Sequence, residues 1–278
     1  MLVFFEYLCK IIIDSRKELM KSVIFRVIAA LSFFTRLPFW RLADVPRRYY
    51  ERVVPLWPLA GWLTGGAMAL VFWLAAMVLP VDVSVVLALV VRVMMTGALH
   101  EDGFADFCDG MGGGTDRKRT LEIMKDSHIG TYGVLGLVLY FLLMFCTLRS
   151  VPVEVLPWVM LCGDAFCKWV SANVIRVLPY ARTEAEAKNR LVYSRTEAVE
   201  SVVSLLLGCL PVAVMVAGAV FPLAWLFALI LPLLAFVVMT MMMRRRLGGY
   251  TGDCCGALFV VCELMFYIGI VATLNILH

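Results

Sequence analysis

The sequence has little of what a soluble enzyme usually carries. Of its 278 residues only 17% are charged, and only three are histidine. No CxxC pair and no Cys/His cluster with the spacing of zinc ligands occurs, which argues against a structural zinc site. The nine cysteines are scattered, several of them within apolar runs, so we interpret them as small apolar residues that stay reduced.

Other familiar patterns are missing as well. There is no GxxxxGK[ST] motif, which argues against a P-loop nucleotide site. The net charge of +4 is too small to predict nucleic acid as a partner. The first residues lack a small-residue cleavage site, and charges recur through Arg26, so we expect no secretory signal peptide.

Apolar residues dominate instead. They make up 62% of the chain, with a mean hydropathy of +0.89, and several runs reach the ~20 residues that cross a bilayer as a helix. We predict an all-α, polytopic helical membrane protein with about seven transmembrane helices. The expected spans are residues 55–79, 83–99, 131–148, 153–177, 198–220, 222–243 and 257–277.

The N-terminal segment differs from these spans because basic residues interrupt its apolar positions. We predict an amphipathic helix on the membrane surface for residues 1–40, with lipid as its partner. Residues 41–278 then form a single transmembrane catalytic domain. The interrupting residues are Lys10, Arg16, Lys17, Lys21 and Arg26.

The charge of the connections predicts the topology. Loops 41–54, 100–130, 179–197 and 244–252 carry four, four, four and three Lys/Arg, while the alternate connections 80–82, 149–152 and 221 carry none, one and none. By the positive-inside rule the first set is cytoplasmic. Every long polar loop then faces the cytoplasm, and we expect the chemistry on that side.

One acidic stretch stands out, with four carboxylates between Glu101 and Asp109 beside an apolar run. On a helix Asp102, Asp106 and Asp109 fall within roughly 60° of one another. Three like charges on one face repel unless a cation neutralises them. Glu101, about 100° away around the helix, either joins them or faces water.

Magnesium suits such a pattern, since it takes few protein carboxylates and leaves positions for substrate phosphates. One aspartate could instead accept a proton from an attacking hydroxyl. The pattern favours metal-assisted phosphoryl transfer. Three alternatives stay open: a solvated, capped helix end, the ion site of a cation- or proton-coupled transporter, and a scaffold for neighbouring enzymes.

Further polar groups have two interpretations each. Residues 112–114 are a flexible glycine turn or a phosphate-contacting loop, and residues 116–125 are an amphipathic helix whose cations hold substrate or lipid headgroups. Asp164 and Lys168, four apart in a span, form an ion pair or bind substrate. Asp253 caps a helix or contacts metal or phosphate.

The acidic stretch also resembles a known family, cobalamin (5′-phosphate) synthase, also called adenosylcobinamide-GDP ribazoletransferase. Matching motifs occur in order from about residue 32 to 265. They are Thr35-Arg36-Leu37-Pro38, His100-x-Asp102-Gly103-x-Ala105-Asp106-x-x-Asp109-Gly110, Ile123-Met124-Lys125-Asp126-Ser127-x-Ile129-Gly130-Thr131-x-Gly133, Pro179-Tyr180-Ala181-Arg182, and Gly248-Gly249-Tyr250-Thr251-Gly252-Asp253-x-x-Gly256-Ala257.

The resemblance implies a reaction in the cytoplasmic (inner) membrane, late in cobalamin biosynthesis. A ribose hydroxyl of α-ribazole or its 5′-phosphate attacks the phosphorus next to the cobinamide of adenosylcobinamide-GDP, and GMP leaves, with magnesium as cofactor. It gives adenosylcobalamin or its phosphate. A corrin is too large for a closed pocket in one small bundle, so we expect an open groove or an interface in a homo-oligomer.

With the acidic pattern, the resemblance yields a set of candidate site residues. Asp102, Asp106 and Asp109 are the candidate catalytic and metal-binding residues, and Asp253 is a further candidate metal ligand. The candidate substrate contacts are His100, Gly103, Gly110, Arg117, Lys125, Asp126, Asp164, Lys168 and Arg182.

Overall fold

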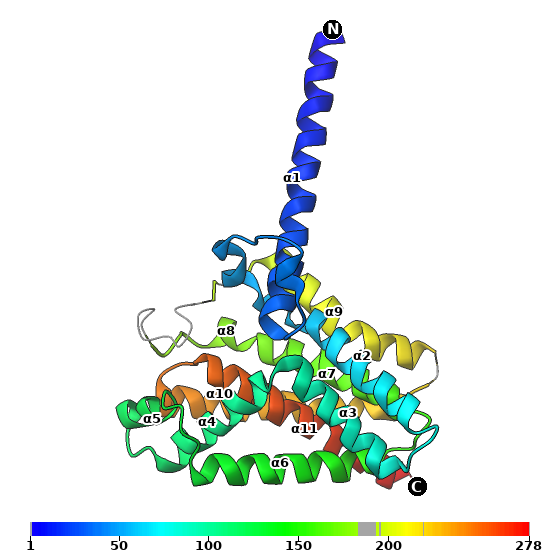
Figure 1. Ribbon diagram of the computed structural model, residues 1–278, viewed down its shortest axis with the longest axis vertical. Coiled ribbons are helices and arrows are strands. Elements are labelled where there is room, and N and C mark those ends of the chain that lie inside the picture. The colour runs from blue at the N-terminus through cyan, green and yellow to red at the C-terminus, as the bar shows by residue number, and fades with distance from the viewer. Residues whose placement is uncertain (1, 183–192, 195, 219, 278) are drawn as a thin grey trace.

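A computed structural model of the protein describes residues 2–182, 193–194, 196–218 and 220–277, and the described chain is a helical bundle without β-strands (Figure 1). Lys188, Arg190 and Arg195 of the predicted basic loop lie outside the described residues. The α-helices are α1 (Leu2–Phe34), α2 (Trp57–Ala75), α3 (Val81–Thr96), α4 (Leu99–Gly113), α5 (Arg117–Ile123), α6 (Thr131–Arg149), α7 (Leu156–Ala172), α8 (Val174–Val177), α9 (Ala198–Ala217), α10 (Ile230–Leu247) and α11 (Gly252–Leu277).

Short 3₁₀ helices complete the connections: η1 (Phe39–Arg41), η2 (Arg47–Arg52), η3 (Val54–Leu56) and η5 (Leu223–Leu229). An isolated parallel bridge joins Tyr180 to Tyr250. The bundle is built around α7 and α11, whose inward faces are almost entirely buried. Glycines let α2 approach α7 closely, since a Cβ on Gly61 would lie 2.7 Å from Ala165 Cα.

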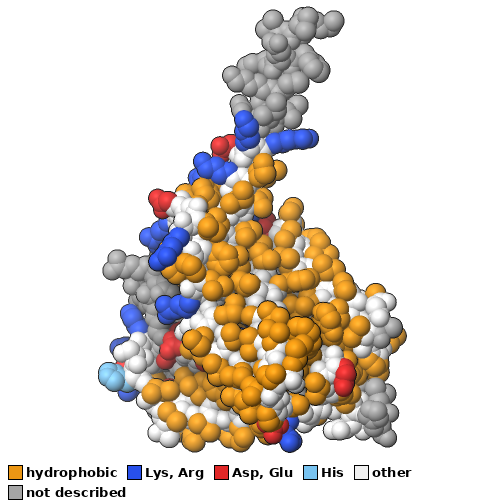
Figure 2. All heavy atoms as spheres, turned by 45° about the vertical axis from the view of Figure 1, so that its right-hand side comes forward, with side chains coloured by type: hydrophobic (Ala, Val, Ile, Leu, Met, Phe, Trp, Pro, Cys, Tyr) orange, Lys and Arg blue, Asp and Glu red, His pale blue; other side chains and the backbone are white. Residues whose placement is uncertain are grey.

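Five of the described helices, with η3 and η5 counted as parts of their spans, are long and apolar enough to cross a membrane, and the count is six if α3 and α4 form one broken span. The predicted count of seven is not confirmed, because α3 and α7 have only 16 and 17 residues. Apolar side chains cover much of the face drawn in Figure 2, as expected of a surface in contact with lipid.

The largest difference from expectation lies between α3 and α4. We expected the second span to run to residue 99 and to lead into the acidic helix face, but α3 ends at Thr96 and the acidic stretch forms a separate helix, bent by 88° from α3. Gly97 and Ala98 make the bend with φ of 63° and 57°, in the left-handed region. This conformation suits glycine and is costly for alanine.

The predicted N-terminal helix is present as α1, which projects far out of the bundle (Figure 1). Its last turn is part of the protein interior, where Phe34 stacks on Trp57 with ring centroids 5.2 Å apart. Arg26 binds Glu200 of α9 at 2.6 Å. The assignment of residues 1–40 to a separate surface segment remains a prediction.

The connections of the bundle lie in different places. In Figure 1, α5 and the turns after α8 and α10 lie at one end, and the α2–α3, α6–α7 and α9–η5 connections lie at the other, near the C-terminus. Three of the four Lys/Arg-rich connections therefore share one end of the bundle, and the fourth, residues 41–54, lies beside the base of α1.

Candidate active site

A cavity of about 250 Å³ opens where α1, α4 and α11 meet. Five segments distant in sequence supply its wall: the end of α1, the region around η3, the start of α4, the Pro179–Arg182 stretch with Tyr193, and the start of α11. The lining residues are Phe33, Phe34, Val54, Trp57, Leu99, His100, Asp102, Tyr180, Arg182, Tyr193, Gly252, Asp253, Cys255 and Gly256.

Four of the predicted site residues meet at this cavity. Asp102 is exposed in the first turn of α4, and Asp253 is 8% exposed in the first turn of α11. Arg182 donates from Nη2 to the carbonyl of Leu121 at 2.8 Å, and its Nη1 lies 3.9 Å from Asp253 Oδ2. His100 is the fourth. The cavity thus combines two carboxylates with a guanidinium that the backbone holds in place.

Close packing of α4 on α11 brings the two carboxylates to one cavity. A Cβ on Gly103 would lie 2.9 Å from the carbonyl oxygen of Asp253, and a Cβ on Gly256 would lie 3.0 Å from that of His100. Any larger side chain at either position would push the helices apart. Gly103, a predicted substrate contact, therefore has a packing role in the structure.

The three aspartates of α4 do not share one environment. Asp102 is exposed, Asp106 is half-buried and Asp109 is buried. Seven residues of helix separate the first from the last by about 10 Å along the axis. Among the described residues, no three His, Cys, Asp or Glu come close enough to hold one metal ion. A metal site built from all three remains a prediction.

Asp109 holds the N-terminus of α6. Its Oδ2 accepts from the amide of Gly130 at 2.7 Å, and its Oδ1 accepts from the amide of Gly133 at 2.8 Å. A Cβ on either glycine would lie 2.5 Å from a carboxylate oxygen, so glycine is needed at both. Asp109 also lines a second cavity, of about 280 Å³, together with Asp126 and His128.

The remaining predicted substrate contacts do not line this cavity, and some of them bind backbone groups instead. Arg117 donates to the carbonyls of Leu247 and Ala181 at 2.7 and 2.8 Å. Gly110 packs against Met124, and Lys125 is exposed. Asp126 is exposed too, and its hydrogen bonds from the ring and amide of His128 lower the pKa of its carboxyl.

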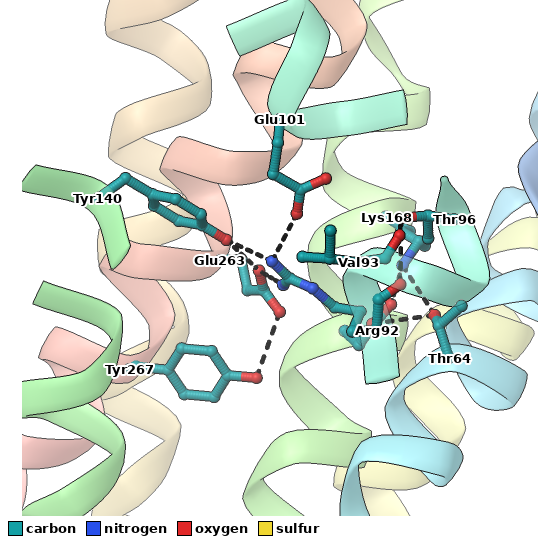
Figure 3. A network of polar contacts seen from close by, with 10 residues as sticks. Thr64, Arg92, Val93, Thr96, Glu101, Tyr140, Lys168, Glu263 and Tyr267 are labelled. Atoms are coloured by element: carbon teal, nitrogen blue, oxygen red, sulfur yellow. Dashed lines mark hydrogen bonds and ion pairs between the residues drawn. The ribbon is translucent and has the colours of Figure 1, made fainter. Parts of the chain in front are cut away.

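A charged network lies inside the bundle beside the cavity (Figure 3). The guanidinium of Arg92 binds the carboxylates of Glu263 and Glu101, the latter at 2.8 Å, and donates to the hydroxyl of Tyr140 at 2.6 Å. Tyr140 and Tyr267 in turn donate to Glu263 at 3.2 and 3.3 Å. Glu101 therefore neither joins the aspartates nor faces water; it is 3% exposed and neutralises Arg92.

The predicted pair of Asp164 and Lys168 is confirmed, and both side chains are fully buried. Thr64 bridges them, donating to Asp164 at 2.9 Å and accepting from Lys168 at 3.0 Å. The Lys168 ammonium also lies 4.2 Å from the ring centre of Phe259, whose other neighbours include His100. Lys168 is therefore linked to the cavity wall through Phe259, which contacts His100.

Sequence reasoning missed Arg92 and the aromatic residues that line the cavity. An arginine inside an apolar run should have indicated a buried ion pair, because intramembrane charges face the protein interior and pair there. No comparable signal marks Phe34 or Trp57, since aromatic residues in apolar segments are common and their meeting depends on the fold.

Comparison with known proteins decides the family. A sequence model described as cobalamin-5-phosphate synthase matches residues 26–271. The chain belongs to the cobalamin-5-phosphate synthase family. It is therefore an enzyme, and the motifs that suggested the family lie within the matched range. Comparison with solved structures found none that matches.

Three similar proteins carry the name adenosylcobinamide-GDP ribazoletransferase. The protein from Leptothrix cholodnii is 38% identical over 253 residues, covering 86% of this chain and 92% of its own. That from Shewanella amazonensis is 36% identical over 245 residues, with the same coverage. That from Leptospira interrogans is 31% identical over 263 residues, covering 90% and 96%. None of these matches supports a transporter.

Proposed function

We propose that this protein transfers adenosylcobinamide phosphate from adenosylcobinamide-GDP to α-ribazole or its 5′-phosphate. A ribose hydroxyl of the acceptor forms a bond to the phosphorus that carries the cobinamide. The bond from that phosphorus to the oxygen of the departing GMP breaks, and the hydroxyl proton passes to a base. The products are adenosylcobalamin or its 5′-phosphate, and GMP.

The observation that carries this proposal is the meeting of Asp102, Asp253 and Arg182 at one cavity. Phosphoryl transfer depends mainly on positioning and on neutralising the charge of the phosphates. A guanidinium matches phosphate oxygens well, and Arg182 is held by Leu121 and by its position beside Asp253. The family membership and the names of the relatives agree with this reaction.

Magnesium fits the two carboxylates of the cavity. It commonly binds through one or two carboxylates together with substrate phosphates, and Asp102 and Asp253 supply that number of hard oxygen ligands. When bound there it would neutralise negative charge on the diphosphate. Asp102, the more exposed of the two carboxylates, is the candidate base for the proton of the attacking hydroxyl.

We further propose that the cavity faces the cytoplasm of a cell whose inner membrane holds the bundle. The support is that three of the four Lys/Arg-rich connections lie at one end of the bundle (Figure 1). The corrin ring, too large for a cavity of about 250 Å³, would then lie in an open groove or between two copies of the chain.

The test is release of GMP by the purified protein in detergent. Adenosylcobinamide-GDP, α-ribazole and magnesium should yield GMP and a cobalamin in equal amounts, and chelation of magnesium should stop the reaction. Detergent abolishes any transmembrane gradient, so the assay separates this chemistry from transport. Absence of GMP under these conditions, with the protein folded, would contradict the proposal.

A further inference from the structure

The cavity has an aromatic half that the transfer chemistry does not use. We define it by Phe33, Phe34, Trp57, His100 and Tyr193, all of which line the cavity. The rings contact one another in series: the indole of Trp57 stacks on Phe34 and also on the imidazole of His100, with centroids 5.2 and 5.6 Å apart. Phe33 meets Tyr193 edge-on at 6.0 Å. Such a wall suits a flat ring.

Two buried side chains of this half have polar atoms without a hydrogen-bond partner among the described residues. One is the indole Nε1 of Trp57, and the other is His100, which is 1% exposed and has no partner at either ring nitrogen. A buried polar group without a partner is costly, and a ligand that supplies the partner would offset that cost. A neutral imidazole offers one N–H donor and one acceptor.

We propose that the aromatic half binds the benzimidazole base of the ribazole substrate, with an N–H of His100 donating to its free ring nitrogen. This inference rests on the proposed function. The glycosylated base is flat and apolar, has no N–H donor, and carries one acceptor nitrogen. It therefore matches an aromatic wall in which the buried polar groups without a partner include the N–H of His100. Its ribose would extend toward Asp102 and Asp253, which line the same cavity.

The other parts of the substrates fit this half less well. A guanine base has several N–H donors along one edge, whereas a neutral His100 offers one acceptor nitrogen and the ring faces of Phe34 and Trp57 offer none. A corrin far exceeds the volume of about 250 Å³, which is slightly below the usual range of small-molecule pockets, ~300–1,000 Å³. The acceptor nucleoside is the substrate part whose size and polarity agree with the aromatic half.

The decisive experiment compares ribazole with the corresponding indole nucleoside, in which a carbon replaces the ring nitrogen. Wild-type protein should prefer ribazole by about 2- to 10-fold in kcat/KM, the range expected for one hydrogen bond. His100→Leu should abolish this preference and raise the KM for ribazole, with the KM for adenosylcobinamide-GDP unchanged. His100→Gln, which keeps an N–H donor, should retain part of the preference.

Two tryptophans provide a matched pair. Trp57 and Trp225 are 2% and 5% exposed and have indole nitrogens without a partner among the described residues, but only Trp57 lines the cavity. Trp57→Leu should raise the KM for ribazole about 10-fold or more, while Trp225→Leu leaves it within twofold. Thermal unfolding identifies variants that fail to fold, and Trp57→Phe replaces Trp57→Leu if needed.

Several outcomes would overturn the inference. A preference for ribazole that survives in His100→Leu would do so, and so would a rise in KM confined to adenosylcobinamide-GDP, which would place guanine in the aromatic half. If wild-type protein released no GMP, the proposed function would fail separately. Equilibrium dialysis of labelled ribazole against wild type and His100→Leu would then test the cavity alone, and absence of binding to wild type would refute the assignment.

Discussion

Arg92 Nη2 lies 2.8 Å from Glu101 Oε1, and this bond joins α3 to α4 across their 88° bend. Both side chains are buried, and Arg92 also binds Glu263 of α11. The bend that carries Asp102 to the cavity is therefore stabilised by charge pairing in the interior. Removal of one member of a buried pair leaves an uncompensated charge, which is strongly destabilising.

Arg92→Met should accordingly lower the free energy of unfolding by about 3–5 kcal/mol, because Glu101 and Glu263 lose their common partner. Glu101→Gln should cost less, about 1–3 kcal/mol, since the amide oxygen can still accept from Arg92. Thermal unfolding in detergent measures both. Equal and small effects would show that the network is not important for stability.

Asp102→Asn should slow GMP release about 100-fold or more and raise the magnesium concentration that gives half-maximal rate. The reason is that asparagine has nearly the same volume as aspartate but lacks the negative charge that would bind magnesium. Asp82→Asn, an exposed carboxylate paired with Arg149 at 2.5 Å, is the control and should leave both quantities unchanged. A normal magnesium dependence in Asp102→Asn would count against the metal assignment.

Asp109→Ala should destabilise the protein by about 0.5–2 kcal/mol, as expected for loss of a helix cap, because two amides of α6 lose their acceptor. Asp109→Asn should recover part of this loss. Neither change should alter the magnesium concentration for half-maximal rate in the protein that stays folded. A large shift in that concentration would restore Asp109 as a metal ligand.

Gly103→Ala should lower the free energy of unfolding by about 1–3 kcal/mol and should also lower kcat in the protein that stays folded. The reason is that the new methyl group meets the backbone of Asp253. Gly66→Ala in α2 is the matched control, since a Cβ there would have no neighbour within 4 Å. The measurements are kcat for GMP release and the midpoint of thermal unfolding. Parallel losses in both variants would refute the role of the α4–α11 contact.

The contact between η2 and α9 should depend on pH. Glu197 binds Arg52 of η2, which lowers the pKa of its carboxyl. A lowered pKa means that the contribution is present at neutral pH and is lost as the pH falls below the usual glutamate value, about 4.3. Spin labels on exposed positions of η2 and α9 should move apart at pH 3.5, and in Glu197→Gln at neutral pH. Glu154→Gln, at an exposed position, should have no effect.

Local features of the fold were predictable from the sequence. Hydropathy indicated α2, α6, α9, α10 and α11, and a spacing of four indicated the pair of Asp164 and Lys168. These depend on residues close in the chain. The bend at Gly97 was not predictable, because its stabilising contacts come from Arg92, Glu263 and the backbone of Arg36, whose amide donates to the carbonyl of Met95 at 2.6 Å.

The candidate site was predictable only in part. Its acids, Asp102 and Asp253, carried the expected pattern and family motifs. Helical spacing grouped Asp109 with Asp102, but it could not predict that Asp109 accepts from the amides of Gly130 and Gly133 at the start of α6. The aromatic half could not be predicted at all, since Phe34, Trp57 and His100 meet only when three helices pack together.

The arrangement of α4 and α11 has an electrostatic consequence. Both helices begin at the cavity, with Leu99 and His100 from one and Gly252 and Asp253 from the other in its wall. Each helix start carries a partial charge of roughly +0.5 from its aligned peptide dipoles, so the two together offset about one of the two carboxylate charges. This field lets two acids share a small cavity, and together with the guanidinium of Arg182 it leaves the cavity close to neutral.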